Sequence, residues 1–203
     1  MTTLLAPEVA DRTAAFEWSQ RIRRVGGFIQ LAFATFWLIR GGLTIGGGVG
    51  TAVTVGSTAV IIAVIVYGVR VTAGTGRRPT SPAAKRVERS VNAATIIELV
   101  ASFVLPVIVI AAGHSDWVLP SIAITIGPLL LWLDHLAHIP RYRPVGWALT
   151  VGPFLLVAVM SGSALAATTG IAAGVLLLGT ATAGFHDLAG TRPARSGVDT
   201  FGG

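Results

Sequence analysis

Residues 91–112, "VNAATIIELVASFVLPVIVIAA", decide the fold. The stretch is apolar except for a few small polar side chains and one acid, Glu98. An α-helix needs about 20 mostly apolar residues to cross the hydrocarbon core of a bilayer, so the stretch predicts a membrane-spanning helix. A carboxyl group inside such a helix is costly, and it is by default a candidate functional group.

Five more stretches of similar length and hydropathy surround this one. The six expected spans are residues 25–43, 50–70, 91–112, 117–138, 144–161 and 164–185. The links "GHSD" and "SGS" are so short that the helices they join must be antiparallel neighbours. We therefore predict an all-α integral membrane protein, a bundle of six transmembrane helices within residues 25–188. Residues 1–24 precede the bundle, and the polar tail 189–203 is predicted to be disordered.

The composition supports a membrane protein and excludes several kinds of site. The chain is 53% hydrophobic and 12% charged, and its mean hydropathy is +0.75. It has no cysteine, which excludes disulfides, cysteine-based zinc sites and thiol nucleophiles. The net charge of +6 would suit nucleic acid, but the basic residues lie in loops between apolar runs, so we expect no nucleic-acid partner. Abundant Arg, Ala, Gly and Val are typical of a bacterial protein from a high-GC genome.

The basic residues also predict the orientation in the membrane. With six spans, 14 of the 15 Lys and Arg residues fall on one side, and Arg40 falls on the other. The positive-inside rule then places both termini in the cytoplasm, in a multi-pass protein of the plasma (cytoplasmic) membrane. Acids stand where a cleavable signal peptide would carry positive charge, so we expect the first span to direct insertion. Residues 9–24 fit an interfacial helix and an unstructured basic arm equally well.

Small residues recur at every fourth position of the last span, at Gly162, Ala166, Gly170 and Gly174. Such a stripe lets another helix backbone approach closely. We expect an intramolecular seam, with a homodimer interface as the alternative. Prolines inside spans three, four and five, at positions 106, 128 and 153, are expected to kink these helices and favour a cavity.

The ionisable and polar side chains within the spans predict a site in the inner half of the membrane. Glu98 lies about 10 Å along its helix from the inner boundary, and Asp134 about 9 Å. We expect Glu98 to face the turn that carries Asp134 and His135, and we assign these three residues as candidate acid–base groups. The candidate substrate-binding residues are Gln30, Tyr67, Asn92, His138 and His186. For His138 and His186 the alternative is that they simply reach the lipid headgroups.

These residues suggest three functions. A carboxylic acid removed from water can retain its proton near neutral pH, so the first is acid–base chemistry on, or binding of, a lipophilic substrate such as an isoprenoid. The second is a small proton-coupled transporter or exporter with Glu98 as its coupling acid. The third is an accessory or scaffold protein without catalysis. The spacing D-H-x-x-H is a weak metal signal, and we expect neither a metal nor a cofactor.

Overall fold

All six expected spans are helical in the structure, a computed structural model that describes residues 20–73 and 82–190. The elements are η1 (Ile22–Gly26), α2 (Gly27–Ile45), α3 (Gly47–Thr72), α4 (Pro82–Ala111), η2 (Ser115–Trp117), α5 (Val118–Ala137), α6 (Tyr142–Val159) and α7 (Gly162–Gly190). No strand occurs within these described ranges. Six helices are long and apolar enough to cross a membrane, which confirms the expected all-α bundle of six candidate spans.

The helix ends differ from the expected boundaries in informative places. Helix α4 begins at Pro82, well before the expected start at residue 91, and α7 continues past residue 185 to Gly190. Residues 20–26 continue directly into α2 as helix, with a π-helical turn at η1. The rest of the segment proposed as an interfacial helix or a basic arm lies outside the described residues. The tail 189–203, predicted to be disordered, is helical at residues 189 and 190, where α7 ends, and its remainder lies outside the described residues.

Most hydroxyl groups inside these helices are satisfied locally, as an apolar surrounding favours, whereas the Trp37 indole N–H and the Thr169 hydroxyl are buried without a hydrogen-bond partner among the described residues. Most threonine hydroxyls in the spans donate to the backbone carbonyl four residues earlier; Thr35, for example, donates to Leu31 O at 2.7 Å. Thr72 does the same to Gly68 O at 2.7 Å, and Thr180 to Leu176 O at 2.6 Å. The link between α2 and α3 turns at Gly46, whose φ of 71° is readily adopted only by glycine.

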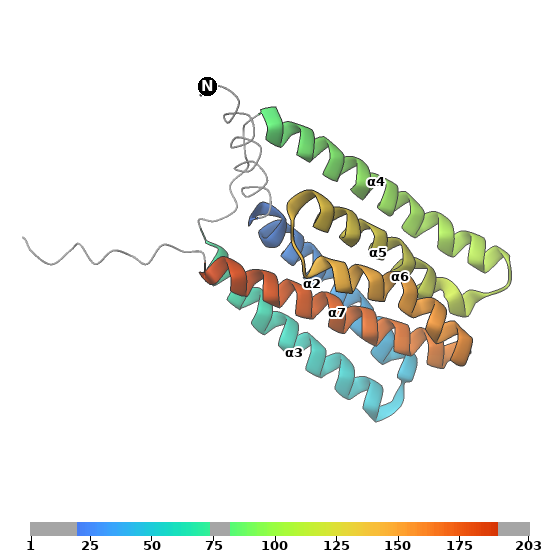
Figure 1. The fold of residues 1–203 in the computed structure, drawn as a ribbon. Coiled ribbons are helices and arrows are strands. Elements are labelled where there is room, and N and C mark those ends of the chain that lie inside the picture. The colour runs from blue at the N-terminus through green and yellow to red at the C-terminus, as the bar shows by residue number, and fades with distance from the viewer. Residues whose placement is uncertain (1–19, 74–81, 191–203) are drawn as a thin grey trace, which may run out of the picture.

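The helices are arranged around a central pair, α2 and α7, which pack against each other more extensively than any other two (Figure 1). Helix α3 lies against both members of this pair, while α5 and α6 pack together on its other side. Helix α4 packs mainly on α5 and forms one edge of the bundle. Helix α2 and helix α4 are not among the extensively packed pairs, so a gap remains between them.

Glycines form the α2–α7 seam. A Cβ added to Gly170 would lie 3.0 Å from Gly41 Cα, and one added to Gly174 would lie 2.5 Å from Leu38 Cγ. The distance at Gly174 is too short for a real Cβ, and the distance at Gly170, to backbone atoms, is tighter than almost all real Cβ contacts, so the absence of side chains here lets the two backbones approach closely. The stripe therefore serves an intramolecular seam with α2, as expected. Gly162 is not part of it, since it turns the chain at the start of α7 with φ of 60° and an added Cβ would meet nothing within 4 Å.

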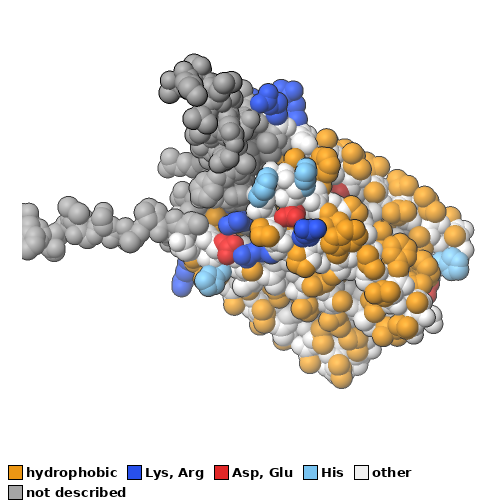
Figure 2. Space-filling model, in the orientation of Figure 1, with side chains coloured by type: hydrophobic (Ala, Val, Ile, Leu, Met, Phe, Trp, Pro, Cys, Tyr) orange, Lys and Arg blue, Asp and Glu red, His pale blue; other side chains and the backbone are white. Residues whose placement is uncertain are grey.

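The surface of the bundle has the character of a lipid-facing protein. Its flanks are largely hydrophobic or uncharged, and in this view charged side chains gather at the end where α7 terminates (Figure 2). Helix α4 is the most exposed span, and its outward side chains include Ile97, Phe103 and Val107 at 66–70% exposure. At the charged end, Asp187 of α7 pairs with Arg23 at 3.4 Å and with Arg141 of the α5–α6 link.

Replacing Gly170 with Leu is expected to destabilise the bundle, because the larger side chain would force α2 and α7 apart. Overpacking of a tight contact typically costs about 1–3 kcal/mol. The melting temperature in detergent should fall. Gly179→Leu is the matched control, because a Cβ at Gly179 on the same helix meets nothing within 4 Å. An unchanged melting temperature for Gly170→Leu, accompanied by dissociation of a dimer, would show that the stripe is a subunit interface.

Candidate functional site

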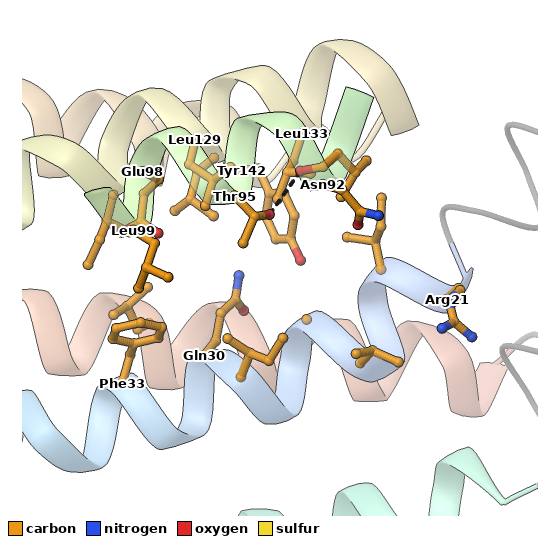
Figure 3. Close-up of a pocket in the computed structure, with 18 of the residues that line it drawn as sticks. Arg21, Gln30, Phe33, Asn92, Thr95, Glu98, Leu99, Leu129, Leu133 and Tyr142 are labelled. Carbon is orange, nitrogen blue, oxygen red and sulfur yellow. Dashed lines mark hydrogen bonds between the residues drawn. The ribbon is translucent and has the colours of Figure 1, made fainter. Parts of the chain in front are cut away.

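A cavity of about 450 Å³ lies between the N-terminal half of α2, α4 and α5 (Figure 3). Its walls are mostly apolar and include Val25, Phe33, Leu99, Leu129 and Leu133. The volume falls within the range of roughly 300–1,000 Å³ that is usual for small-molecule sites. The cavity thus combines the size and the apolar lining of a ligand site with the few polar groups described below.

The cavity opens at the flank of the bundle, between α2 and α4. Ile29 and Phe33 on the α2 rim are exposed, as are Thr95 and Leu99 on the α4 rim. The inner walls are buried: Leu130 of α5 is 3% exposed and Leu177 of α7 is 1% exposed. A molecule that dissolves in the hydrocarbon of a bilayer could therefore enter this cavity sideways, without passing through water.

Glu98 is buried at the cavity wall, with 9% of its surface exposed. Its carboxyl oxygen Oε1 forms a 2.8 Å hydrogen bond with the hydroxyl of Ser102, one helical turn further along α4. Ser102 Oγ is in turn 2.6 Å from Thr125 Oγ1 of α5. This polar contact ties α4 to α5 and places the carboxyl group at the boundary between the helix seam and the cavity.

Gln30 and Tyr142 add two polar side chains to the lining from different elements, α2 and the start of α6. Both side chains are buried, at 7% and 3% exposure, and both point toward the space that Glu98 borders (Figure 3). The Gln30 amide and the Tyr142 hydroxyl approach each other within this space (Figure 3). Asn92 and Thr95 of α4 add an amide and a hydroxyl to the lining. The interior of the cavity therefore presents uncharged hydrogen-bonding groups together with one carboxyl group.

Besides Glu98, the cavity is lined by one basic residue, Arg21, and one further acidic residue, Glu88. Glu88 is ten residues before Glu98 on α4, which separates them by about 15 Å along the helix axis. Arg21 lies just before η1 and Glu88 lies in the first turns of α4, and these two helix starts are at the same end of the bundle (Figure 1). Apart from Glu98, ionisable groups are thus confined to one end of the cavity, and the deeper part is lined by apolar and uncharged hydrogen-bonding side chains.

The structure brings together Glu98, Gln30 and Asn92 of the predicted site residues and leaves the others outside the cavity. Tyr67 is on α3, away from the cavity, and is 37% exposed. His135 is exposed and lies against Trp132, with ring centroids 6.3 Å apart. His138 and His186 are exposed at helix ends, and His138 caps α5 with a φ of 52°. The predicted roles of these residues are not tested by their positions.

Asp134 and Glu98 are not paired. The contact between Ser102 and Thr125 sets the register of antiparallel α4 and α5, and in this register Glu98 is level with Leu129. Asp134 is five residues further along α5, about 7 Å closer to the charged end. No hydrogen bond joins the two acids in the described part of the chain, and Asp134 does not line the cavity. The expected face-to-face arrangement rested on counting residues from assumed helix ends, and α4 begins earlier than assumed.

Ser102, Thr125 and Tyr142 belong to the site but are absent from the sequence prediction. Ser102 follows Glu98 by four residues, a spacing that places two side chains on one helix face, so it could have been found. Thr125 becomes a neighbour only through the register between α4 and α5. Tyr142 stands at the start of α6, is buried and lines the cavity together with residues of α2, α4 and α5.

Among the residues the structure describes, no group of three or more His, Asp or Glu side chains is arranged to hold a metal ion. Comparisons of the chain with protein families, with characterised proteins and with solved structures found no match. The chemistry of the cavity is therefore the basis for assigning a function.

The contact between Gln30 and Tyr142 can be tested by a double-mutant cycle with Gln30→Leu and Tyr142→Phe. Each change removes one partner of a buried polar pair, so each alone should lower the free energy of unfolding by about 1 kcal/mol. The double variant should lose less than the sum of the two, with a coupling of at least about 0.5 kcal/mol. Additive losses in chemical unfolding would show that the two side chains do not interact.

Proposed function

We propose that this protein binds a lipophilic molecule in the α2–α4 cavity and carries out acid–base chemistry on it with Glu98. The observation that carries the proposal is a buried carboxyl group at the wall of an apolar cavity open to the flank of the bundle. A group of this kind is costly within a membrane unless it has a function or a partner. Ser102 forms a hydrogen bond with one oxygen of the Glu98 carboxyl group, and the cavity would give that carboxyl group access to a ligand.

The distribution of polar groups suggests how a ligand would be held. Apolar side chains of α2, α4 and α5 would surround a hydrocarbon chain, such as that of an isoprenoid. Gln30, Asn92 and Tyr142 offer donors and acceptors that would orient a polar end near Glu98. The cavity has few charged lining groups, which favours a lipophile with an uncharged head over a phospholipid.

We further propose that the six helices span the plasma membrane with both termini in the cytoplasm. The alternation of six candidate spans and the 14-to-1 distribution of basic residues support this orientation. The charged end of the bundle, with Arg23, Arg141 and Asp187, would then lie at the cytoplasmic surface. The cavity would open to the inner half of the membrane, since Arg21 and Glu88 line its end on that side.

Cysteine labelling tests the orientation, and the absence of native cysteine gives it no background. Single cysteines at Ser115 and Ser161 should react with a membrane-impermeant maleimide added to intact cells, because both positions lie in the predicted outer links. A cysteine at Ala84 should react only after the cells are permeabilised. Labelling of Ser115→Cys from the cytoplasmic side alone would reverse the orientation and place the cavity in the outer half.

Photolabelling tests ligand binding. The probe is a diazirine-bearing farnesol analogue, added to the protein in vesicles of phosphatidylcholine and phosphatidylglycerol. We expect saturable labelling of residues 22–33 and 88–99, because these segments form the two rims of the cavity. Excess unlabelled farnesol should displace the probe at these segments, and mass spectrometry of the labelled peptides reports both results.

Two matched variants separate cavity binding from general solubility in lipid. Ile29→Trp places a larger ring at the rim and should weaken saturable labelling roughly tenfold, a change of about 1.4 kcal/mol in binding. Ile62→Trp on α3 is the control, since Ile62 is similarly exposed and lies outside the cavity. Labelling that is unsaturable and spread over all exposed apolar faces would contradict the proposal and favour a scaffold without a ligand site.

A further inference from the structure

Four oxygen atoms form a continuous chain from the cavity wall into helix α5. Glu98 Oε1 is 2.8 Å from Ser102 Oγ, and Ser102 Oγ is 2.6 Å from Thr125 Oγ1. Thr125 Oγ1 is 2.8 Å from the backbone carbonyl oxygen of Ile122. Each of these three distances lies in the range of an O–H···O hydrogen bond, so each contact calls for one proton between its two oxygens.

The two hydroxyl groups supply only two of these three protons. If Glu98 is ionised, Ser102 donates to Glu98 and Thr125 donates to the Ile122 carbonyl. No proton is then left for the 2.6 Å contact between Ser102 and Thr125, and two oxygen lone pairs face each other at the shortest distance in the chain. If Thr125 instead donates to Ser102, the contact with Ile122 loses its proton.

We propose that Glu98 carries the third proton, and that Ser102 and Thr125 are positioning residues that hold it in the neutral acid form. In this form Glu98 donates to Ser102, Ser102 donates to Thr125, and Thr125 donates to the carbonyl of Ile122. Every contact in the chain then has one proton. The proton on Glu98 is inferred from the three oxygen–oxygen distances. A catalytic role for that proton rests on the function proposed above.

The surroundings of the carboxyl group agree with a neutral acid. The side chains that face the cavity from α2 near Glu98 are Gln30 and Phe33, and α7 contributes Leu177. Helix α5 presents leucines and Ile126 to the cavity. Asp134 lies about 7 Å along α5 from Leu129, the residue that is level with Glu98. The charged lining groups Arg21 and Glu88 stand toward the far end of the cavity. An ionised carboxylate would thus have no cation beside it among the lining residues, in surroundings that penalise an isolated charge.

A protonated Glu98 begins the reaction as the acid and not as the base. Its second oxygen, Oε2, has no hydrogen-bond partner in the described ranges and is not sealed from the cavity, so the carboxyl group can turn its O–H toward a ligand. The O–H bond of Glu98 would break and the proton would pass to a basic oxygen or an electron-rich double bond of the ligand. The carboxylate that remains would accept a hydrogen bond from Ser102, which in turn would accept one from Thr125.

This direction of proton transfer narrows the ligand class. A neutral carboxyl group attracts no cation, and the interior of the cavity has no positive group to hold a phosphate. The fitting ligand is an uncharged lipophile that carries a proton-accepting group, such as a carbonyl, an ether or an alkene. The two hydroxyl groups can reverse direction without moving their oxygens, but the ionised form then lacks the hydrogen bond between Thr125 and the Ile122 carbonyl, which favours return of the proton to Glu98.

Infrared spectroscopy of the ligand-free protein in vesicles tests the assignment. At neutral pH we expect a carbonyl stretch of a protonated carboxylic acid that shifts when the protein is labelled with ¹³C-glutamate. This measurement needs no variant and separates glutamates from aspartates. The band should be lost in Glu98→Gln and retained in Asp134→Asn. A neutral-pH spectrum without a glutamic acid carbonyl band would overturn the proposal.

The hydroxyl chain is tested by a second set of variants. Thr125→Val keeps the shape of the side chain and removes the oxygen that accepts from Ser102, so the acid band at neutral pH should shrink; Thr125→Ser should restore it. Ser121→Ala is the control, since Ser121 is buried on the same helix and, among the described residues, its hydroxyl bonds only to Val118 O. An unchanged band in Thr125→Val would refute the positioning role. A glutamic acid band with no saturable photolabelling would uphold the proton assignment and refute the ligand site.

Discussion

The close approach of α2 and α7 is the contact on which the rest of the bundle depends. Hydrocarbon tails are as apolar as the helix surfaces, so burial alone does not drive helices together in a membrane, and close packing must do so. Gly41, Gly170 and Gly174 supply that packing, because side chains at these positions would collide with the facing helix. The seam with α7 fixes one side of α2, and α3 packs against both α2 and α7.

The cavity lies where the helices do not pack closely, between α2 and α4. Helix α4 is tied to α5, in part through the contact between Ser102 and Thr125, and has no glycine seam with α2. The gap between α2 and α4 is therefore lined by side chains and open at the flank. The polar groups at its walls are mostly paired with each other or with the backbone, which limits the cost of placing them among apolar side chains. Glu98 is the member of this set that can exchange a proton.

The sequence predicted the features that depend on composition and spacing along one helix. Runs of about 20 apolar residues located all six helices, and the small residues at every fourth position of the last span, Gly170 and Gly174 among them, located the seam. The sequence did not reveal which helices flank the cavity, because this depends on the register between helices. Residue counting paired Glu98 with Asp134, whereas the observed register places Thr125 and Leu129 beside the Glu98 turn. Tyr142 lines the site from the start of α6, a placement that no local sequence pattern indicates.

The central claim is that the gap between α2 and α4 is a ligand site built around Glu98. The most direct test is a crystal structure grown in a lipidic mesophase that contains farnesol. The account predicts elongated density between the two helices, with its polar end within hydrogen-bonding distance of Glu98 and its tail along Phe33 and Leu99. Helix α4 packed tightly against α2 with the cavity closed, or Glu98 paired with Asp134 and no density beside it, would contradict the account.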